Sequence, residues 1–165
     1  MRVSEAALAL ITRVNAQGET EYLTQWNEKW QACSLIGGHR EQSESFWECC
    51  NREMEEELRL KREVDFRVAS VGLSSRLEYV ATSQAAGVAT LYRIELFSAA
   101  ILTIAAIAII DGNADNCWVT TSEIGCGTTA SGRPVAEQVG RVLNHLGREA
   151  ATLRSNVACL HPASF

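Results

Sequence analysis

The sequence predicts a single domain of the α/β (α+β) class. Three observations support this class: apolar or alternating segments typical of strands, a central segment rich in helix formers, and a late segment with apolar residues at helical spacing. With 165 residues, 47% of them hydrophobic, the chain can bury a sizeable core. We therefore expect one domain over residues 1–150 and a C-terminal tail over residues 151–165.

The N-terminal part has the pattern of a hairpin followed by a third strand. Residues 6–14 form an apolar run that ends at the turn-forming segment 15–19. Residues 20–26 then alternate between apolar and polar, as in a half-buried strand. Residues 32–38 indicate a short strand that ends in a pair of glycines.

The middle of the chain predicts a helix and then several strands. Residues 44–60 contain no glycine or proline and are rich in helix formers. Residues 64–110 are rich in Val, Ile, Leu and aromatic residues, with breaks at 82–87 and 98–100. The apolar run 96–110 is shorter than the roughly 20 residues that a membrane span requires, so we expect a buried strand there.

The last element indicated by the sequence is a helix. A turn is expected at residues 111–116, and Pro134 suits the first turn of the helix that follows. Apolar residues recur at helical spacing after this proline and predict a face that packs on the sheet. They are Val135, Val139, Val142, Leu143 and Leu146.

Composition excludes several classes of function. A net charge of −5 and a pI near 5.3 argue against a general nucleic-acid binder. The six cysteines form no CxxC pair and the three histidines have no HExxH spacing, so a structural zinc site is not expected. No secretory signal is apparent at the N-terminus, and we expect no membrane association and reduced thiols in a cytoplasm.

The glutamates between residues 53 and 57 suggest a metal site. On a helix Glu53, Glu56 and Glu57 share one face, whereas Glu55 points elsewhere. Their mutual repulsion is relieved by a hard divalent cation, and Mg²⁺ or Mn²⁺ suits carboxylate ligands. Arg52 can hold one of these carboxylates with its planar guanidinium. The alternative is a solvated acidic helix face, which is common.

The spacing upstream favours the metal site and resembles the Nudix box. In that motif a glycine, five residues, a glutamate and seven residues precede the sequence Arg-Glu, apolar, any, Glu-Glu, any, Gly, apolar. The matching residues here are Gly38, Glu44, Arg52, Glu53, Met54, Glu56, Glu57 and Leu60. The departure is Arg59, which stands where the family has glycine. Either Arg59 adopts a left-handed conformation at about 1 kcal/mol or the helix continues past it.

The resemblance implies a fold, an activity and site residues. The family has an α/β/α sandwich around a mixed β-sheet, and catalyses Mg²⁺-dependent hydrolysis of a nucleoside diphosphate linked to another moiety. The family's metal ligands match Glu53, Glu56 and Glu57, and a backbone carbonyl of Gly37 or Gly38 completes the set. The resemblance further implies that Glu44 and Arg52 brace the helix and loop by an ion pair.

The general base is left open by the sequence. Glu53 and Glu56 are the candidates within the motif, and Glu123 and Glu95 are the candidates outside it. Glu123 has turn-forming neighbours in a segment that could bring it to the site, although solvated or helix-capping acids are more common. Glu95 lies in a strand pattern and can face either way.

The substrate is also left open. Several aromatic residues could stack on a nucleobase, although each is more often a packing residue. They are Tyr22, Trp26, Trp30, Tyr92 and Trp118. The candidate substrates that the resemblance implies are nucleotide sugars, ADP-ribose, dinucleoside polyphosphates and nucleoside triphosphates. The alternative is a catalytically silent sensor that binds a nucleotide or a protein, and a homodimer is possible in either case.

Overall fold

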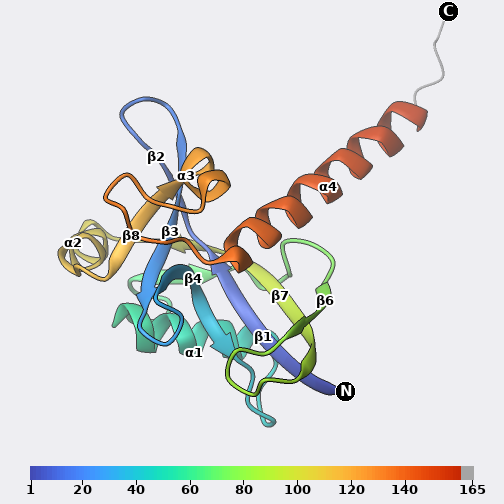
Figure 1. The fold of residues 1–165 in the computed structure, drawn as a ribbon. Helices are drawn as coiled ribbons and strands as arrows, with labels where there is room; N and C mark the ends of the chain where they lie inside the picture. Colours follow the sequence, from blue (N-terminus) through green and yellow to red (C-terminus); the bar gives the residue numbers. More distant parts are fainter. Residues whose placement is uncertain (161–165) are drawn as a thin grey trace, which may run out of the picture.

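A computed structural model describes the backbone of residues 1–160 and the side chains of residues 1–151 (Figure 1). The strands are β1 Arg2–Leu10, β2 Thr12–Val14, β3 Thr20–Asn27, β4 Ala32–His39, β5 Phe66–Val68, β6 Leu77–Thr82, β7 Ala89–Ile101 and β8 Asn116–Thr120. The helices are α1 Phe46–Leu58, α2 Ile104–Gly112, α3 Thr121–Cys126 and α4 Glu137–Leu160.

The eight strands form one mixed sheet. Its order is β2-β3-β4-β1-β7-β5, with β6 also paired to β7 and β8 paired to β3. At the centre, β1 runs parallel to β7 over its whole length and antiparallel to β4. The predicted hairpin forms between β2 and β3, and β1 is a separate central strand. These pairings confirm the prediction of a mixed sheet.

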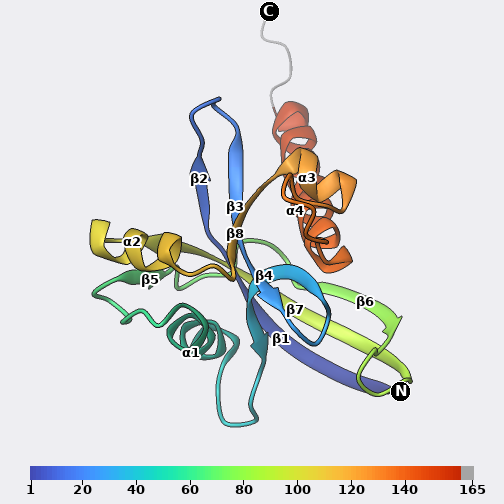
Figure 2. The ribbon, with the colours of Figure 1, turned by 60° about the vertical axis from the view of Figure 1, so that its left-hand side comes forward.

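Helices cover both faces of this sheet (Figures 1 and 2). Because side chains alternate along a strand, β1 sends Ala7 and Ala9 to one face and Ala6 and Leu8 to the other. The first face packs against buried residues of α1 and α2, and the second packs against the start of α4. The α/β/α sandwich is therefore confirmed.

Helix α1 is fixed at both ends by its sequence. Ser45 is the N-cap and forms a capping box with Glu48, in which each side chain bonds the other residue's backbone N–H. The helix ends at Arg59, which has a left-handed backbone with φ of 57° and ψ of 37°. Of the two outcomes left open by the sequence, the structure has the strained cap and not a longer helix.

The apolar run at residues 96–110 is only partly a strand. Strand β7 continues through Ser98–Ala100 to Ile101, so the expected break at residues 98–100 is wrong. The expected strand beyond Ile101 is also wrong, because Thr103 caps a new helix, α2, by accepting a hydrogen bond from the backbone N–H of Ala106. A run that is apolar on all sides carries no periodicity that separates helix from strand.

The C-terminal helix begins later and ends later than the sequence predicts. Pro134 precedes the helix in an extended segment, where its carbonyl accepts from the backbone N–H of Cys33 at 2.8 Å. The helix α4 continues into the expected tail as far as Leu160, and residues 161–165 lie outside the described part. No helix among the described residues is long and apolar enough to cross a membrane.

The left-handed cap at Arg59 predicts that Arg59→Gly stabilises the protein. Glycine adopts this backbone without a Cβ penalty, so the free energy of unfolding should rise by about 0.5–1 kcal/mol. Urea unfolding measures the change. The matched control is Arg59→Ala, which removes the side chain and keeps the strain, and it should stay within about 0.5 kcal/mol of wild type. Equal stability of the Gly and Ala variants would show that the cap stores no strain.

Candidate metal and substrate site

Arg52 joins helix α1 to the segment that precedes it. Its guanidinium donates to both carboxylate oxygens of Glu44, from Nη2 at 2.7 Å and from Nε at 3.1 Å. The same side chain donates to Glu53 at 2.8 Å and to the backbone carbonyl of His39 at 3.0 Å. A planar guanidinium suits such bidentate pairing, and the Arg52 hydrogen bond holds the pKa of Glu44 down at about 2.

Gly37 and Gly38 let the end of β4 approach the acidic face of α1. A Cβ on Gly38 would lie 2.5 Å from Oε1 of Glu53, so any side chain there would displace this carboxylate. Gly37 has φ of +138°, and its backbone N–H donates to Glu57 at 2.9 Å. The two glycines therefore set the positions of two of the three predicted carboxylate ligands.

Glu57 is partly buried and carries a raised pKa. The pKa of this carboxyl is raised from 4.5 to about 7, chiefly by burial, against the Gly37 hydrogen bond and with a smaller contribution from the charges of Glu53 and Glu56. The three acids thus influence one another electrostatically, as the helical spacing predicts. A cation bound among them would favour the ionised form of Glu57.

Glu56 is the most exposed of the three acids. Its side chain is 61% exposed, and it is paired with Arg52 at 3.3 Å. In the described residues no three His, Cys, Asp or Glu side chains converge as a ready metal cage. The oxygen donors nevertheless suit Mg²⁺ or Mn²⁺, and the exposed Glu56 can turn from Arg52 toward an ion at little cost.

Two residues that support α1 were not identified from the sequence. Arg40 pairs with Glu5 and donates from Nη1 to the backbone carbonyl of Glu44 at 2.8 Å. Gln25 of β3 donates to the backbone carbonyl of Glu57 at 3.1 Å. These contacts fix both ends of the acidic helix, and both depend on strands that are distant in sequence.

The two acids proposed outside the motif are engaged elsewhere. Glu123 lies on α3, which is well separated from α1 in both views (Figures 1 and 2). Its carboxylate accepts from the backbone N–H groups of Thr120 and Ala130, and despite opposing burial these bonds lower its pKa. Glu95 forms an ion pair with Arg76 at 2.5 Å. The structure does not bring either acid to the cluster.

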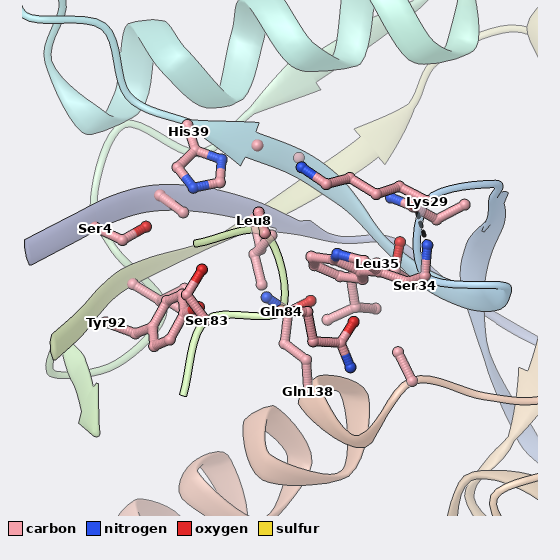
Figure 3. Close-up of a pocket in the computed structure, with 18 of the residues that line it drawn as sticks. Ser4, Leu8, Lys29, Ser34, Leu35, His39, Ser83, Gln84, Tyr92 and Gln138 are labelled. Atoms are coloured by element: carbon pink, nitrogen blue, oxygen red, sulfur yellow. Dashed lines mark hydrogen bonds between the residues drawn. The ribbon is translucent and has the colours of Figure 1, made fainter. Parts of the chain in front are cut away.

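A cleft of about 890 Å³ opens beside the acidic cluster, on the sheet face that α4 covers. Its floor consists of β1, β4, β6 and β7, and its walls include the β3–β4 and β6–β7 turns and the start of α4 (Figure 3). Gly37, Gly38, Arg52 and Glu53 belong to both the cleft and the cluster. The volume is large enough for a nucleotide with a second attached group.

Of the aromatic residues considered for stacking, Trp30 and Tyr92 line this cleft. Tyr22 and Trp118 pack against the core clusters, and the guanidinium of Arg133 lies 5.7 Å from the ring centre of Trp26. Tyr79 also lines the cleft but was not identified from the sequence. The pairing of β6 with β7 determines which side of the sheet its side chain lies on.

Comparisons with known proteins agree with this architecture. A family model described as the NUDIX domain matches residues 4–124. The crystal structure of C. elegans Ap4A hydrolase is 16% identical, with a TM-score of 0.57, covering 88% of this chain and 97% of that chain. A NUDIX hydrolase from Nitrosomonas europaea is 16% identical, with a TM-score of 0.53, covering 90% of this chain and 91% of that chain.

A third solved structure belongs to a protein bound to nucleic acid. Shewanella oneidensis NrtR complexed with a 27mer DNA is 15% identical, with a TM-score of 0.53, covering 88% of this chain and 58% of that chain. No protein in the curated set matches the sequence. At these identities the solved structures show a shared fold.

The raised pKa of Glu57 predicts a pH-dependent stability in the absence of metal. The pKa of Glu57 is about 7 in the folded state, and the ordinary value of 4.5 applies in the unfolded state. The folded state therefore binds more protons than the unfolded state between these pH values. The stabilising effect of protonation is therefore present below pH 4.5 and lost as the pH rises to 7. Glu57→Gln, which stays neutral, should exceed wild type in stability by up to roughly 3 kcal/mol at pH 8.

Urea unfolding in EDTA at pH 4.5 and pH 8 measures this difference. The two proteins should be close in stability at the lower pH and separated at the higher pH. The pKa of Glu44 is lowered, so its contribution to the free energy of unfolding is lost as the pH falls below 4.5. Both proteins contain Glu44, and the difference between them therefore cancels this effect. A difference that does not vary with pH would contradict the prediction.

Proposed function

Because this chain belongs to the Nudix family of pyrophosphohydrolases, we propose that it uses Mg²⁺ or Mn²⁺ to hydrolyse a pyrophosphate bond in a nucleoside diphosphate linked to another moiety. The family match confirms the resemblance that rests on residues 38–60. The resemblance holds although Arg59 stands where the family has glycine. The proposed substrates include nucleotide sugars, ADP-ribose and nucleoside triphosphates, and the cleft volume of about 890 Å³ supports this proposal.

The observation that carries the proposal is that the acidic cluster and the cleft share one boundary. Glu53 lines the cleft and is held there by Arg52 at 2.8 Å, and Gly37 and Gly38 complete the same edge. Glu57 lies behind this edge and bonds the backbone of Gly37. A ligand in the cleft can therefore place its phosphates next to the carboxylates, which repel phosphate unless a cation lies between them.

The residues divide into ligands and supports. Glu53, Glu56 and Glu57, with a carbonyl of Gly37 or Gly38, would hold the ion. Bound there, a divalent ion would neutralise phosphate oxygens and activate water for attack on phosphorus. Arg52 and Glu44 keep α1 against the end of β4, which fixes the ligand positions.

Glu56 is the best candidate for the general base, with Glu53 as the second. The carboxylate of Glu53 lies against Gly38 and bonds Arg52 at 2.8 Å, whereas that of Glu56 is exposed and bonds Arg52 at 3.3 Å. An acid with a loosely held carboxylate can accept a proton and release it to solvent more readily. Glu123 and Glu95 are bonded elsewhere, which disfavours them in this role.

The likeness to C. elegans Ap4A hydrolase supports dinucleoside polyphosphates among the candidate substrates. The second candidate function is a catalytically silent domain that binds a nucleotide or a protein partner as a sensor. The likeness to NrtR in its DNA complex leaves the expectation of no nucleic-acid partner as a prediction. The retained acids favour the enzyme. A cytoplasmic location and a possible homodimer remain part of the proposal.

Hydrolysis of a nucleotide panel with Mg²⁺ tests the proposed function. The panel contains nucleotide sugars, ADP-ribose, nucleoside triphosphates and dinucleoside polyphosphates, and phosphate-containing products are measured. At least one compound should be cleaved, and cleavage should stop in EDTA. Glu56→Gln and Glu57→Gln should each lower kcat by roughly a hundredfold to a thousandfold, because losing an acidic group costs several kcal/mol of transition-state stabilisation.

Glu55→Gln is the matched control, because Glu55 lies on the same helix but pairs with Arg62 at 3.3 Å. This variant should retain at least half of the wild-type kcat. A wild-type protein that binds nucleotides and cleaves none of the panel would favour the sensor. Equal losses in all three variants would mean that helix charge, and not the metal site, is responsible.

A further inference from the structure

Arg40, the residue after strand β4, is held to the central strand β1 by both its backbone and its side chain. Its backbone N–H donates to the carbonyl of Glu5 at 2.9 Å and so continues the pairing of β4 with β1. Its guanidinium donates to the carboxylate of the same residue, from Nε at 3.0 Å and also from Nη2. One residue of β1 therefore fixes the position of Arg40.

The remaining nitrogen of the Arg40 guanidinium reaches the segment that precedes α1. Nη1 donates to the backbone carbonyl of Glu44 at 2.8 Å. The guanidinium also lies over the ring of Phe46, the first residue of α1, at 5.1 Å from the ring centre. A single planar group thus bonds β1 along one edge and the start of α1 along another.

Glu44 connects Arg40 to the acidic cluster. Its backbone carbonyl accepts from Arg40, and its carboxylate accepts from Arg52 at 2.7 Å. Arg52 in turn donates to Glu53 at 2.8 Å. Residues of alternating charge therefore form one hydrogen-bonded series, which we name the charge chain (Glu5, Arg40, Glu44, Arg52 and Glu53).

The end of the charge chain at Glu5 is part of the sheet. Glu5 of β1 is paired with Arg93 of β7, and Arg93 is paired with Glu78 of β6. Nη1 of Arg93 lies 4.0 Å from the carboxylate of Glu5, and its Nε lies 3.1 Å from that of Glu78. Opposite charges on neighbouring strands stabilise a sheet. The charge chain therefore starts from three paired strands and ends at a predicted metal ligand.

The pair formed by Glu5 and Arg40 is partly shielded from solvent. The exposed fraction is 26% for the side chain of Glu5 and 25% for that of Arg40. Hydrogen bonding by Arg40 lowers the pKa of Glu5 against the effect of burial, with smaller contributions from the charges of Arg93 and Arg76. Without Glu5, the guanidinium of Arg40 would lose the partner that aims it at the start of α1.

We infer that Glu5 and Arg40 are positioning residues for the cation site: they fix the start of α1 and thereby the carboxylates that would hold Mg²⁺ or Mn²⁺. This inference rests on the proposed function and makes the cation affinity depend on residues outside the acidic cluster. Glu5 shares its face of β1 with Ala7 and Ala9, which pack against α1, so it faces away from the cleft. Its effect on the ion therefore acts through Arg40 and Glu44.

A direct electrostatic effect of the two charges predicts a different pattern. Removing the carboxylate of Glu5 would weaken cation binding, whereas removing the positive charge of Arg40 would strengthen it. Loss of positioning weakens binding in both cases, because residues that orient metal ligands typically change metal affinity by roughly ten- to a hundredfold. The sign of the Arg40 effect therefore separates the two explanations.

Mn²⁺ binding, followed by electron paramagnetic resonance of the free ion, tests the inference without relying on catalysis. Glu5→Ala and Arg40→Gln should each lower the Mn²⁺ affinity about tenfold. The double variant should lie within about threefold of the single variants, since the two residues act as one unit. Glu57→Gln should also lower the affinity, which assigns the measured ion to the acidic cluster.

Arg40→Lys separates positioning from stability. Lysine keeps a positive charge beside Glu5, but its ammonium lacks the planar fork that reaches Glu5 and the carbonyl of Glu44 together. The melting midpoint should change by less than about 4 °C, while the Mn²⁺ affinity should fall about fivefold or more. Arg67→Gln is the matched control, because Arg67 forms an exposed ion pair with Glu63 at 2.8 Å. It should bind Mn²⁺ within about twofold of wild type.

Three results would each overturn the inference. They are an Mn²⁺ affinity within about twofold of wild type in Glu5→Ala or Arg40→Gln, a tighter affinity in Arg40→Gln, and a wild-type affinity in Arg40→Lys, which would assign the effect to charge. The proposed hydrolysis fails separately. If Mn²⁺ affinity depends on Glu57, Glu5 and Arg40 while no compound of the nucleotide panel is cleaved, the positioning role stands and the enzymatic function falls. A wild-type protein that binds no Mn²⁺ would overturn both.

Discussion

The site depends on one interaction, the hydrogen bonding of the Arg52 guanidinium. This side chain connects α1 to Glu44 and to the carbonyl of His39, and so connects the acidic helix to the end of the central strand β4. Both members of the Arg52–Glu44 pair are largely shielded, with 24% and 12% of their side chains exposed. Removing the arginine would leave shielded carboxylates without their cation, which is far more costly than losing a surface ion pair.

Much of this arrangement depends on residues that lie close together in the sequence, and for that reason it could be predicted. Glu44, Arg52 and the acids that follow lie within fourteen residues, and helical periodicity alone places Glu53, Glu56 and Glu57 on one face. The predicted helix begins at residue 44, whereas the capping box at Ser45 explains why α1 begins at Phe46. The glycine loop likewise follows from a pattern a few residues long, whereas the mixed sheet was implied by the resemblance to the Nudix family.

The features that could not be predicted depend on pairing between distant strands. Glu5 and Arg93 are 88 residues apart in sequence, and only the parallel register of β1 with β7 places them together. The helix α2 was missed because Ile104, Ile107 and Ile109 remain exposed, so its apolar sequence gives no amphipathic signal. The partial burial of Glu57 is also a tertiary effect, since helical spacing gives its direction on α1 but not what covers it.

The number of donors on Arg52 has a further consequence for chemistry. Its Nε and both Nη atoms already donate to Glu44, Glu53, Glu56 and the His39 carbonyl. A guanidinium engaged in this way organises carboxylates and has little capacity left to neutralise a substrate's phosphates. Glu44, Glu53 and Glu56 against one arginine already leave the cluster with excess negative charge, and ionised Glu57 adds to it. In the proposed reaction a bound cation would supply the charge neutralisation that Arg52 does not, so the hydrogen bonds that hold α1 in place agree with the proposed dependence on a divalent ion.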